Sequence, residues 1–126
     1  MNVVGIGIDL MQGERIRRVF GRHGDRFLHR IYTRRELDYC NAARDPYERL
    51  AARWAAKEAT FKALGCPKSI TRWTDIEVTH SDAGAPRVLL SGETGRWARD
   101  AGIAAIEISL SHSDGLAVAS VMVLGQ

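Results

Sequence analysis

The stretch DPYERLAARWAAKEATFKALG, residues 45–65, carries the strongest structural signal in the chain. Asp45 is a residue type that caps helix N-termini, and Pro46 fits the first helical turn, where its missing N–H has no partner to lose. Gly65 stands where a helix commonly ends in the left-handed conformation, and Pro67 blocks continuation. The alanine-rich interior has high helix propensity. The sequence therefore predicts one long helix between these signals.

Projected at 100° per residue, this helix shows two adjoining stripes of side chains. The apolar stripe, which we expect to face the core, comprises Leu50, Trp54, Phe61 and Leu64. The second stripe comprises Ala51, Ala55, Glu58 and Lys62. Its alanines predict open space before a carboxylate and an ammonium, which suits a ligand lying along the helix. The simpler interpretation is an i,i+4 ion pair on a solvated face, worth about 0.3–0.5 kcal/mol, and the helix alone favours it.

Lys57 projects into the apolar stripe, where an unpaired charge is costly. Its ammonium must reach solvent, find a partner or lie at a subunit interface. The chain has three lysines against 15 arginines, and two of the three, Lys57 and Lys62, lie within six residues. The use of lysine here, in a chain that otherwise uses arginine, indicates that this region requires a compact ammonium on a flexible side chain.

On either side of this helix, the N-terminal part of the chain favours a strand and helices, and the C-terminal part favours strands. Residues 3–10 have the β-branched, apolar composition of a buried strand, with glycines where another segment can approach the backbone. A helix is predicted at 12–23, ended by Gly24, and another from the capping box at 33–36 to about Ala43. After the long helix, strands are predicted at 75–80, 86–91, 104–111 and 115–123, with a short helix at 93–101.

These elements predict a single α+β domain over residues 1–126: a small, mostly antiparallel sheet of about five strands packed on one long helix with two or three shorter helices. Hydrophobic residues make up 45% of the chain and charged residues 26%, which is typical of a soluble globular protein. No apolar run approaches the roughly 20 residues of a membrane-spanning helix, and no N-terminal targeting segment is recognisable. Cys40 and Cys66 are too few for a disulfide scaffold. We therefore expect a cytoplasmic protein without membrane contact.

Asp9 ends the first predicted strand, where a carboxylate is either a surface cap or a ligand. If it came within ~4 Å of Glu58, the repulsion would be about 4 kcal/mol at an effective dielectric constant near 20. A divalent cation removes that repulsion. Two carboxylates, with the remaining positions taken by water and phosphate, are typical of Mg²⁺ sites. The two residues are therefore candidate metal ligands, provided that the fold brings them together.

Ser111-His112-Ser113 lies at a strand end before a tight turn. A histidine there can donate to phosphate, act as an acid or base, or simply cap the turn. No GxSxG motif surrounds either serine, which argues against a hydrolase triad, and the glycine pair near the N-terminus lacks the third glycine of a dinucleotide motif. The other histidines have no partners at ligand spacing and are expected at the surface: His23, His29 and His80.

Eight arginines and only two acids lie between Glu14 and Arg35, a local net charge of +6 in a chain of net charge +3. Three of them, Arg15, Arg18 and Arg22, form one stripe of the helix at 12–23. This asymmetry indicates an anionic partner, either an acidic protein or RNA, unless the face is merely solvated. Aromatic residues, which RNA-binding proteins use for stacking, are not interleaved with these arginines, so we expect no nucleic acid.

Four segments occur together in the chain: GIGIDL at 5–10, RWAAKEATFKALG at 53–65, WTDIEV at 73–78 and SLSHSDGLAVASV at 109–121. In this order and in a chain of this length, they resemble the holo-acyl-carrier-protein synthase type of 4′-phosphopantetheinyl transferase. The resemblance also includes FLHRIYTRREL at 27–37, so it extends over nearly the whole chain.

The resemblance implies an enzyme that moves the phosphopantetheine group of coenzyme A onto a serine of apo-acyl carrier protein. It implies Asp9 and Glu58 as Mg²⁺ ligands, with Glu58, Lys62 and His112 carrying the chemistry and Lys62 neutralising the pyrophosphate. It also implies a homotrimer with active sites shared between subunits, which would give Lys57 an interface position or a supporting role near the site. The residues implied for coenzyme A are Arg53, Lys62, Gly65, Pro86, His112 and Ser113. Those implied for docking the acidic carrier protein are Arg15, Arg22 and Arg26, with Arg18 extending the stripe in this chain.

Several points stay open at this stage. The general base could be Glu58, Asp9 through a metal-bound water, or Asp38 near the subunit interface. The chain departs from the family pattern at Thr60-Phe61, where the aromatic residue comes one position late, and at Cys66-Pro67, where Thr-Gly is usual. Both departures lie near the expected nucleotide pocket. The carrier could serve fatty-acid or polyketide synthesis. Two other functions compete: a metal-dependent nucleotide pyrophosphohydrolase that uses the same carboxylates, and a non-enzymatic basic RNA-binding module.

Overall fold

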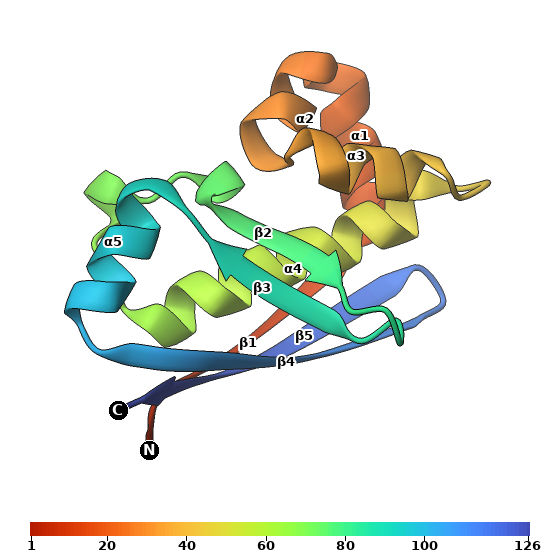
Figure 1. The fold of residues 1–126 in the computed structure, drawn as a ribbon. Coiled ribbons are helices and arrows are strands. Elements are labelled where there is room, and N and C mark those ends of the chain that lie inside the picture. Colours follow the sequence, from red (N-terminus) through yellow and green to blue (C-terminus); the bar gives the residue numbers. More distant parts are fainter.

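The computed structural model describes residues 1–126 as five strands, five α-helices and two single-turn 3₁₀-helices (Figure 1). In chain order the elements are β1 (Asn2–Gln12), α1 (Gly13–His23), α2 (Asp25–Ile31), α3 (Arg34–Asn41), α4 (Pro46–Leu64), η1 (Lys68–Ile70), η2 (Trp73–Asp75), β2 (Ile76–His80), β3 (Pro86–Leu90), α5 (Gly92–Asp100), β4 (Ile103–Ser113) and β5 (Leu116–Gly125). None of the helices combines the length and apolar character needed to cross a membrane.

The five strands form two antiparallel sheets, one of three strands in the order β1-β5-β4 and one formed by the hairpin β2-β3. Helix α4 packs against β1 and β5 of the larger sheet and also touches β2 (Figure 1). Asn2 pairs with Gly125, so the two chain ends lie side by side. The predicted α+β class, with mostly antiparallel strands on one dominant helix, is confirmed. The division of the strands into two sheets is a detail that the strand pattern did not predict.

Helix α4 begins and ends at the predicted signals. The Asp45 carboxylate accepts a hydrogen bond from the Tyr47 N–H at 3.0 Å, Pro46 occupies the first turn, and Gly65 follows the last turn at φ 68°. Of the apolar stripe, Leu50 and Leu64 are buried in the core. The two aromatic members of the stripe are partly buried and join a cluster of rings described below.

Strand β1 and helix α4 pack backbone to backbone. A Cβ atom at Gly5 would lie 1.8 Å from the carbonyl oxygen of Ala63, and one at Gly7 would lie 2.0 Å from that of Ala59. Only glycine allows this approach, which confirms that the glycines of the first strand admit another segment. The expected ligand space beside Ala51 and Ala55 is absent because both alanines are fully buried in the core. That prediction was wrong: helix spacing identifies which residues share a face but not what packs on it.

Helix α2 was not expected from the sequence. Gly24 ends α1 at φ 64°, as predicted, but the chain then turns directly into a second helix of seven residues. Helix α3 begins with the predicted capping box, in which Thr33 accepts from the Glu36 N–H and the Glu36 carboxylate accepts from the Thr33 N–H. Together α1, α2 and α3 form the helical layer beyond one end of α4 (Figure 1).

The outer face of the three-stranded sheet is apolar and exposed. Alternation along β1 turns Gly5, Gly7 and Asp9 toward α4 and the intervening side chains outward. The large apolar side chains exposed on β1 and its partner β5 include Val4, Ile6, Ile8, Leu10 and Met122, and Ile6 reaches 70% exposure. Monomeric soluble proteins rarely leave such a contiguous apolar surface in water, so this face has the character of an interface.

Candidate active site

The first cluster of functional side chains lies where β1 passes α4. Because Asp9 follows Gly5 and Gly7 on the same face of β1, its carboxylate is directed at the helix, and its side chain is only 12% exposed. Oδ1 accepts a hydrogen bond from Nζ of Lys62 at 3.0 Å, and the same ammonium lies 3.2 Å from the carbonyl oxygen of Ile8. Oδ2 is buried and has no hydrogen-bond partner in the chain.

Glu58 reaches the same place from α4. Its Oε1 accepts a hydrogen bond from the indole N–H of Trp54 at 2.5 Å. Burial raises the pKa of Glu58 above its ordinary value, and the neighbouring Asp9 carboxylate raises the pKa further, while the Trp54 hydrogen bond opposes both. The structure therefore brings Asp9 and Glu58 together, as the metal hypothesis requires, and their proximity disfavours two negative charges.

This pair fits a divalent cation. Asp9 Oδ2 is an unpartnered acceptor, the two carboxylates repel each other, and oxygen ligands are those that Mg²⁺ prefers. No group of three or more His, Cys, Asp and Glu side chains is arranged to enclose a metal ion. The remaining coordination positions would thus fall to water and to phosphate oxygens of a substrate, which is the usual arrangement for Mg²⁺.

A second cluster surrounds Arg53, on a different side of α4. Arg53 and Glu58 are five positions apart in the sequence, which corresponds to about 140° around the helix axis. Arg53 is 3% exposed and forms no ion pair, and its Nε has no hydrogen-bond partner. Its guanidinium lies over the Tyr39 ring, 4.0 Å from the centroid, and Nη2 lies 3.3 Å from Nδ1 of His80. A buried cation without a counter-charge favours an anionic ligand.

Arg53 borders a cavity of about 570 Å³ that also contains Pro86 and His112. Nδ1 of His112 pairs with the Glu48 carboxylate from the first turn of α4. His80 was expected at the surface without partners at ligand spacing; it is partly buried and lines the cavity, where it contacts Arg53. Burial and the nearby Arg53 and Arg49 charges lower the pKa of His80, which favours the neutral ring.

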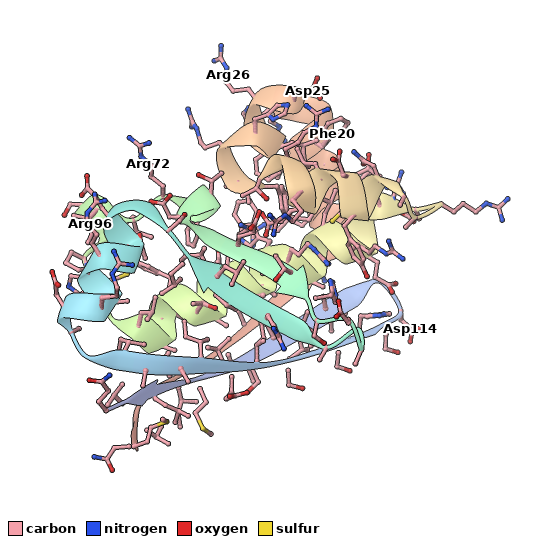
Figure 2. All side chains as sticks on the ribbon, in the orientation of Figure 1. Phe20, Asp25, Arg26, Arg72, Arg96 and Asp114 are labelled. Atoms are coloured by element: carbon pink, nitrogen blue, oxygen red, sulfur yellow. The ribbon has the colours of Figure 1, made fainter.

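The structure does not bring all the expected coenzyme residues together within one chain. Asp9, Glu58 and Lys62 do not line the cavity beside Arg53. Ser113 lines a neighbouring cavity of about 810 Å³, at the tip of the β4–β5 hairpin near Asp114 (Figure 2). Gly65 is exposed at the far end of α4 and lines neither cavity.

The predicted docking arginines are all exposed on the helical layer. Arg15, Arg18 and Arg22 line a shallow depression on α1 together with Val19. Arg26 extends from α2 away from the rest of the molecule (Figure 2). The expected stripe along α1 is therefore present as a basic surface.

Lys57 is fully buried and has found its partner within the chain. Its ammonium lies 2.7 Å from Glu36 Oε1 and donates to the carbonyl oxygens of Ile76 and Trp73 at 2.6 and 3.0 Å. The interface position considered from the resemblance is thus excluded for this side chain. Sequence reasoning had identified Lys57 as requiring a partner but had no signal for Glu36, which already had a role in the capping box.

The two departures from the family pattern are accommodated by packing. The Thr60 hydroxyl is buried and donates to the Ala56 carbonyl oxygen at 2.7 Å. Phe61 packs edge to face on Trp73, with ring centroids 5.7 Å apart. Cys66 is buried, with its Sγ 3.2 Å from the Thr71 hydroxyl.

Sequence comparisons with known proteins identify the family of this chain. Residues 5–119 match the model of the 4′-phosphopantetheinyl transferase superfamily. The holo-[acyl-carrier-protein] synthase of Desulforudis audaxviator is 46% identical over 123 residues, covering 98% of this chain and 94% of that protein. The synthase of Solibacter usitatus is 41% identical over 121 residues, covering 95% and 97% of the two chains.

Solved structures give the same result. The crystal structure of the holo-[acyl-carrier-protein] synthase from Neisseria meningitidis superposes with a TM-score of 0.89 at 31% identity, covering 97% of this chain and 98% of that chain. The Helicobacter pylori synthase in complex with coenzyme A superposes with a TM-score of 0.82 at 32% identity, covering 94% and 99%. The chain therefore belongs to the holo-acyl-carrier-protein synthases of the 4′-phosphopantetheinyl transferase superfamily.

Proposed function

We propose that this chain transfers the 4′-phosphopantetheine group of coenzyme A to a serine of apo-acyl carrier protein, with Mg²⁺ held between Asp9 and Glu58. The observation that supports the metal site is that these two carboxylates are neighbours, and that one of them has a buried oxygen without a hydrogen-bond partner. Family membership supports the reaction and both substrates. Mg²⁺ at this site would neutralise charge on the pyrophosphate oxygens of the coenzyme.

The reaction breaks a phosphoanhydride bond of coenzyme A and forms a phosphodiester on the carrier. The serine oxygen of the carrier forms a bond to the phosphorus that bears the pantetheine arm, and the bond from that phosphorus to the bridging oxygen breaks. Adenosine 3′,5′-bisphosphate leaves, and a carboxylate of the site takes the serine proton. Lys62 lies beside Asp9, where its half-exposed ammonium can neutralise the negative charge that develops on the leaving group. Positioning and charge neutralisation are the main requirements of phosphoryl-group transfer.

The nucleotide end of coenzyme A fits the second cluster. Arg53, buried and unpaired, offers a cationic site for a phosphate group, and His112 and Pro86 border the same cavity. Bidentate recognition of phosphate is the characteristic use of a guanidinium. For Ser113 and Gly65, a role in binding coenzyme A rests on the family resemblance alone, because neither residue lines this cavity.

We further propose a homotrimer in which neighbouring subunits share each active site. The two clusters lie on different sides of α4, so one coenzyme molecule would contact them most readily across a subunit boundary. The exposed apolar face of β1 supports such an assembly, since burying Ile6, Ile8 and Leu10 would remove a large apolar surface from water. The basic surface formed by Arg15, Arg18, Arg22 and Arg26 would then guide the acidic carrier by electrostatic attraction.

The test is transfer itself. Incubating the protein with Mg²⁺, coenzyme A and apo-carrier should add the phosphopantetheine mass to the carrier serine, as read by mass spectrometry. Glu58→Ala should abolish transfer while the circular dichroism spectrum stays native. Folded wild-type protein that leaves the carrier mass unchanged would refute the function, and full activity of Glu58→Ala would refute the metal assignment. Release of adenosine 3′,5′-bisphosphate without carrier would indicate the pyrophosphohydrolase instead.

A further inference from the structure

The indole of Trp54 makes a specific contact with one member of the carboxylate pair. Trp54 and Glu58 lie one turn apart on α4, and the indole N–H donates to Glu58 Oε1 at 2.5 Å. A hydrogen bond to an ionised carboxylate is roughly twice as strong as one between neutral groups. A phenylalanine at this position would still place an aromatic ring toward the core, although a smaller one, but it would supply no donor.

Aromatic rings from three other segments hold this indole in place. Phe27 of α2 stacks on it with centroids 5.2 Å apart and an interplanar angle of 16°. Tyr32, between α2 and α3, contacts it edge-on at 6.4 Å, and Trp73 of η2 lies at 6.3 Å. Each such aromatic pair contributes about 0.5–1.5 kcal/mol beyond area burial, so the indole has little freedom to turn. The donor is thus presented in one fixed direction.

The contact leaves Glu58 restrained but still able to bind a cation. Only Oε1 accepts the indole hydrogen, and the carboxylate keeps its other oxygen for a further ligand. Lys62 restrains Asp9 in a similar way, by donating to Oδ1 and leaving Oδ2 unpartnered. Each carboxylate is therefore held by one oxygen and open at the other.

We propose that Trp54 is a positioning residue of the metal site, whose N–H orients the Glu58 carboxylate for the cation shared with Asp9. This inference rests on the proposed function, because it concerns the same cation. Hydrogen-bond partners of metal ligands orient them and commonly contribute tenfold or more to metal affinity. Trp54 does not touch the reacting atoms in this assignment, and acts through Glu58.

The first experiment observes the indole directly. The chain contains three tryptophans, so ¹⁵N-indole labelling gives three N–H signals, assigned by Trp73→Phe and Trp97→Phe. We expect the Trp54 signal to lie downfield of the other two and to shift on titration with Mg²⁺, while the Trp97 signal stays unchanged. A Trp54 signal that is insensitive to saturating Mg²⁺ would overturn the proposal.

The second experiment measures metal binding without turnover. Trp54→Phe should weaken Mn²⁺ binding about tenfold in electron paramagnetic resonance titrations, since it removes the donor and keeps an aromatic ring in the cluster. Trp97→Phe, the same change in α5, is the matched control and should bind as wild type. Transfer by Trp54→Phe should recover at high Mg²⁺, which a purely structural defect would not do. Wild-type Mn²⁺ affinity in folded Trp54→Phe, or activity loss that high Mg²⁺ does not rescue, would contradict the proposal.

The metal site itself has a separate control. Glu58→Gln should abolish specific Mn²⁺ binding, because the neutral amide is a poor ligand for a hard cation. Mn²⁺ binding that survives Glu58→Gln would overturn the proposed metal site rather than the role of Trp54 alone.

Discussion

Helix α4 carries two lysines that each pair with a carboxylate from another element, and the two pairs differ in every other respect. Lys57 and Glu36 are completely buried, and backbone carbonyl and N–H groups occupy their remaining hydrogen-bonding positions. Lys62 is half exposed, and Asp9 keeps a buried oxygen without a partner. The same type of ion pair is thus saturated at one position and unsaturated five residues later.

The difference separates a structural role from a binding role. Burial lowers the pKa of Lys57, and the Glu36 carboxylate opposes that shift, so the pair is needed to keep the ammonium charged in the core. Nothing is left on this pair for a ligand. The pair at Lys62 has one free carboxylate oxygen, a second carboxylate beside it and access to solvent, which are the properties of a site that takes up a substrate.

The largest effect on stability should come from breaking the buried, saturated pair of Lys57 and Glu36. Glu36→Gln keeps the side-chain shape but leaves the Lys57 ammonium buried without its ion-pair partner, so the free energy of unfolding should fall by about 3–5 kcal/mol in urea titrations. Arg34→Ala, which removes an exposed pair with Asp38 on the same helix α3, serves as the control and should cost less than about 0.5 kcal/mol. A Glu36→Gln protein as stable as wild type would show that the buried charge does not depend on this carboxylate.

Breaking the unsaturated pair of Lys62 and Asp9 should affect catalysis instead of stability. Lys62→Ala should reduce kcat for carrier modification about 100-fold, because the ammonium no longer neutralises the leaving group. Its free energy of unfolding should stay close to wild type, since the lysine is half exposed. Lys68→Ala on η1 is the comparison among the few lysines of the chain and should leave kcat unchanged. A large stability loss in Lys62→Ala without a kinetic defect would reverse the two roles.

The smallest expected effect is a pH-dependent change in stability caused by Glu58. Its folded-state pKa is raised by burial and by Asp9, so the folded protein binds this proton more tightly than the unfolded chain does. The resulting stabilisation is present below the unfolded-state pKa and is lost as the pH rises through the folded-state pKa. In metal-free buffer at pH 7, Glu58→Gln should therefore raise the free energy of unfolding by about 0.5 kcal/mol, a value limited by solvent screening. The gain should vanish near pH 4, and an equal gain at both pH values would exclude charge repulsion as its cause.

Local signals in the sequence were enough for the elements but not for their contacts. The ends of α4 were predictable because Asp45, Pro46 and Gly65 act within one turn of the helix. Helix α2 was missed because Gly24 gives a stop signal, and the helix that follows it has packing support from residues far along the chain, such as Trp54 against Phe27.

The site followed the same rule. Asp9 and Glu58 could be named as a pair from residue type and resemblance, whereas the Trp54 donor to Glu58 was overlooked even though its spacing of four residues on one helix was a usable signal. His80 meets Arg53 across 27 residues, and no local pattern predicts such a contact. Buried pairs like Lys57 with Glu36 depend on the arrangement of whole elements, which only the folded chain defines.

The contact of Gly5 and Gly7 with the carbonyl groups of α4 also determines how well the carboxylate spacing withstands sequence change. No side chain stands between strand and helix there, so main-chain dimensions alone set the gap that Asp9 spans. Substitutions elsewhere in the core can alter volume and rotamers without moving this junction. One added methyl group at either glycine would wedge the two segments apart, and the catalytic geometry would then be lost while most of the domain could still fold.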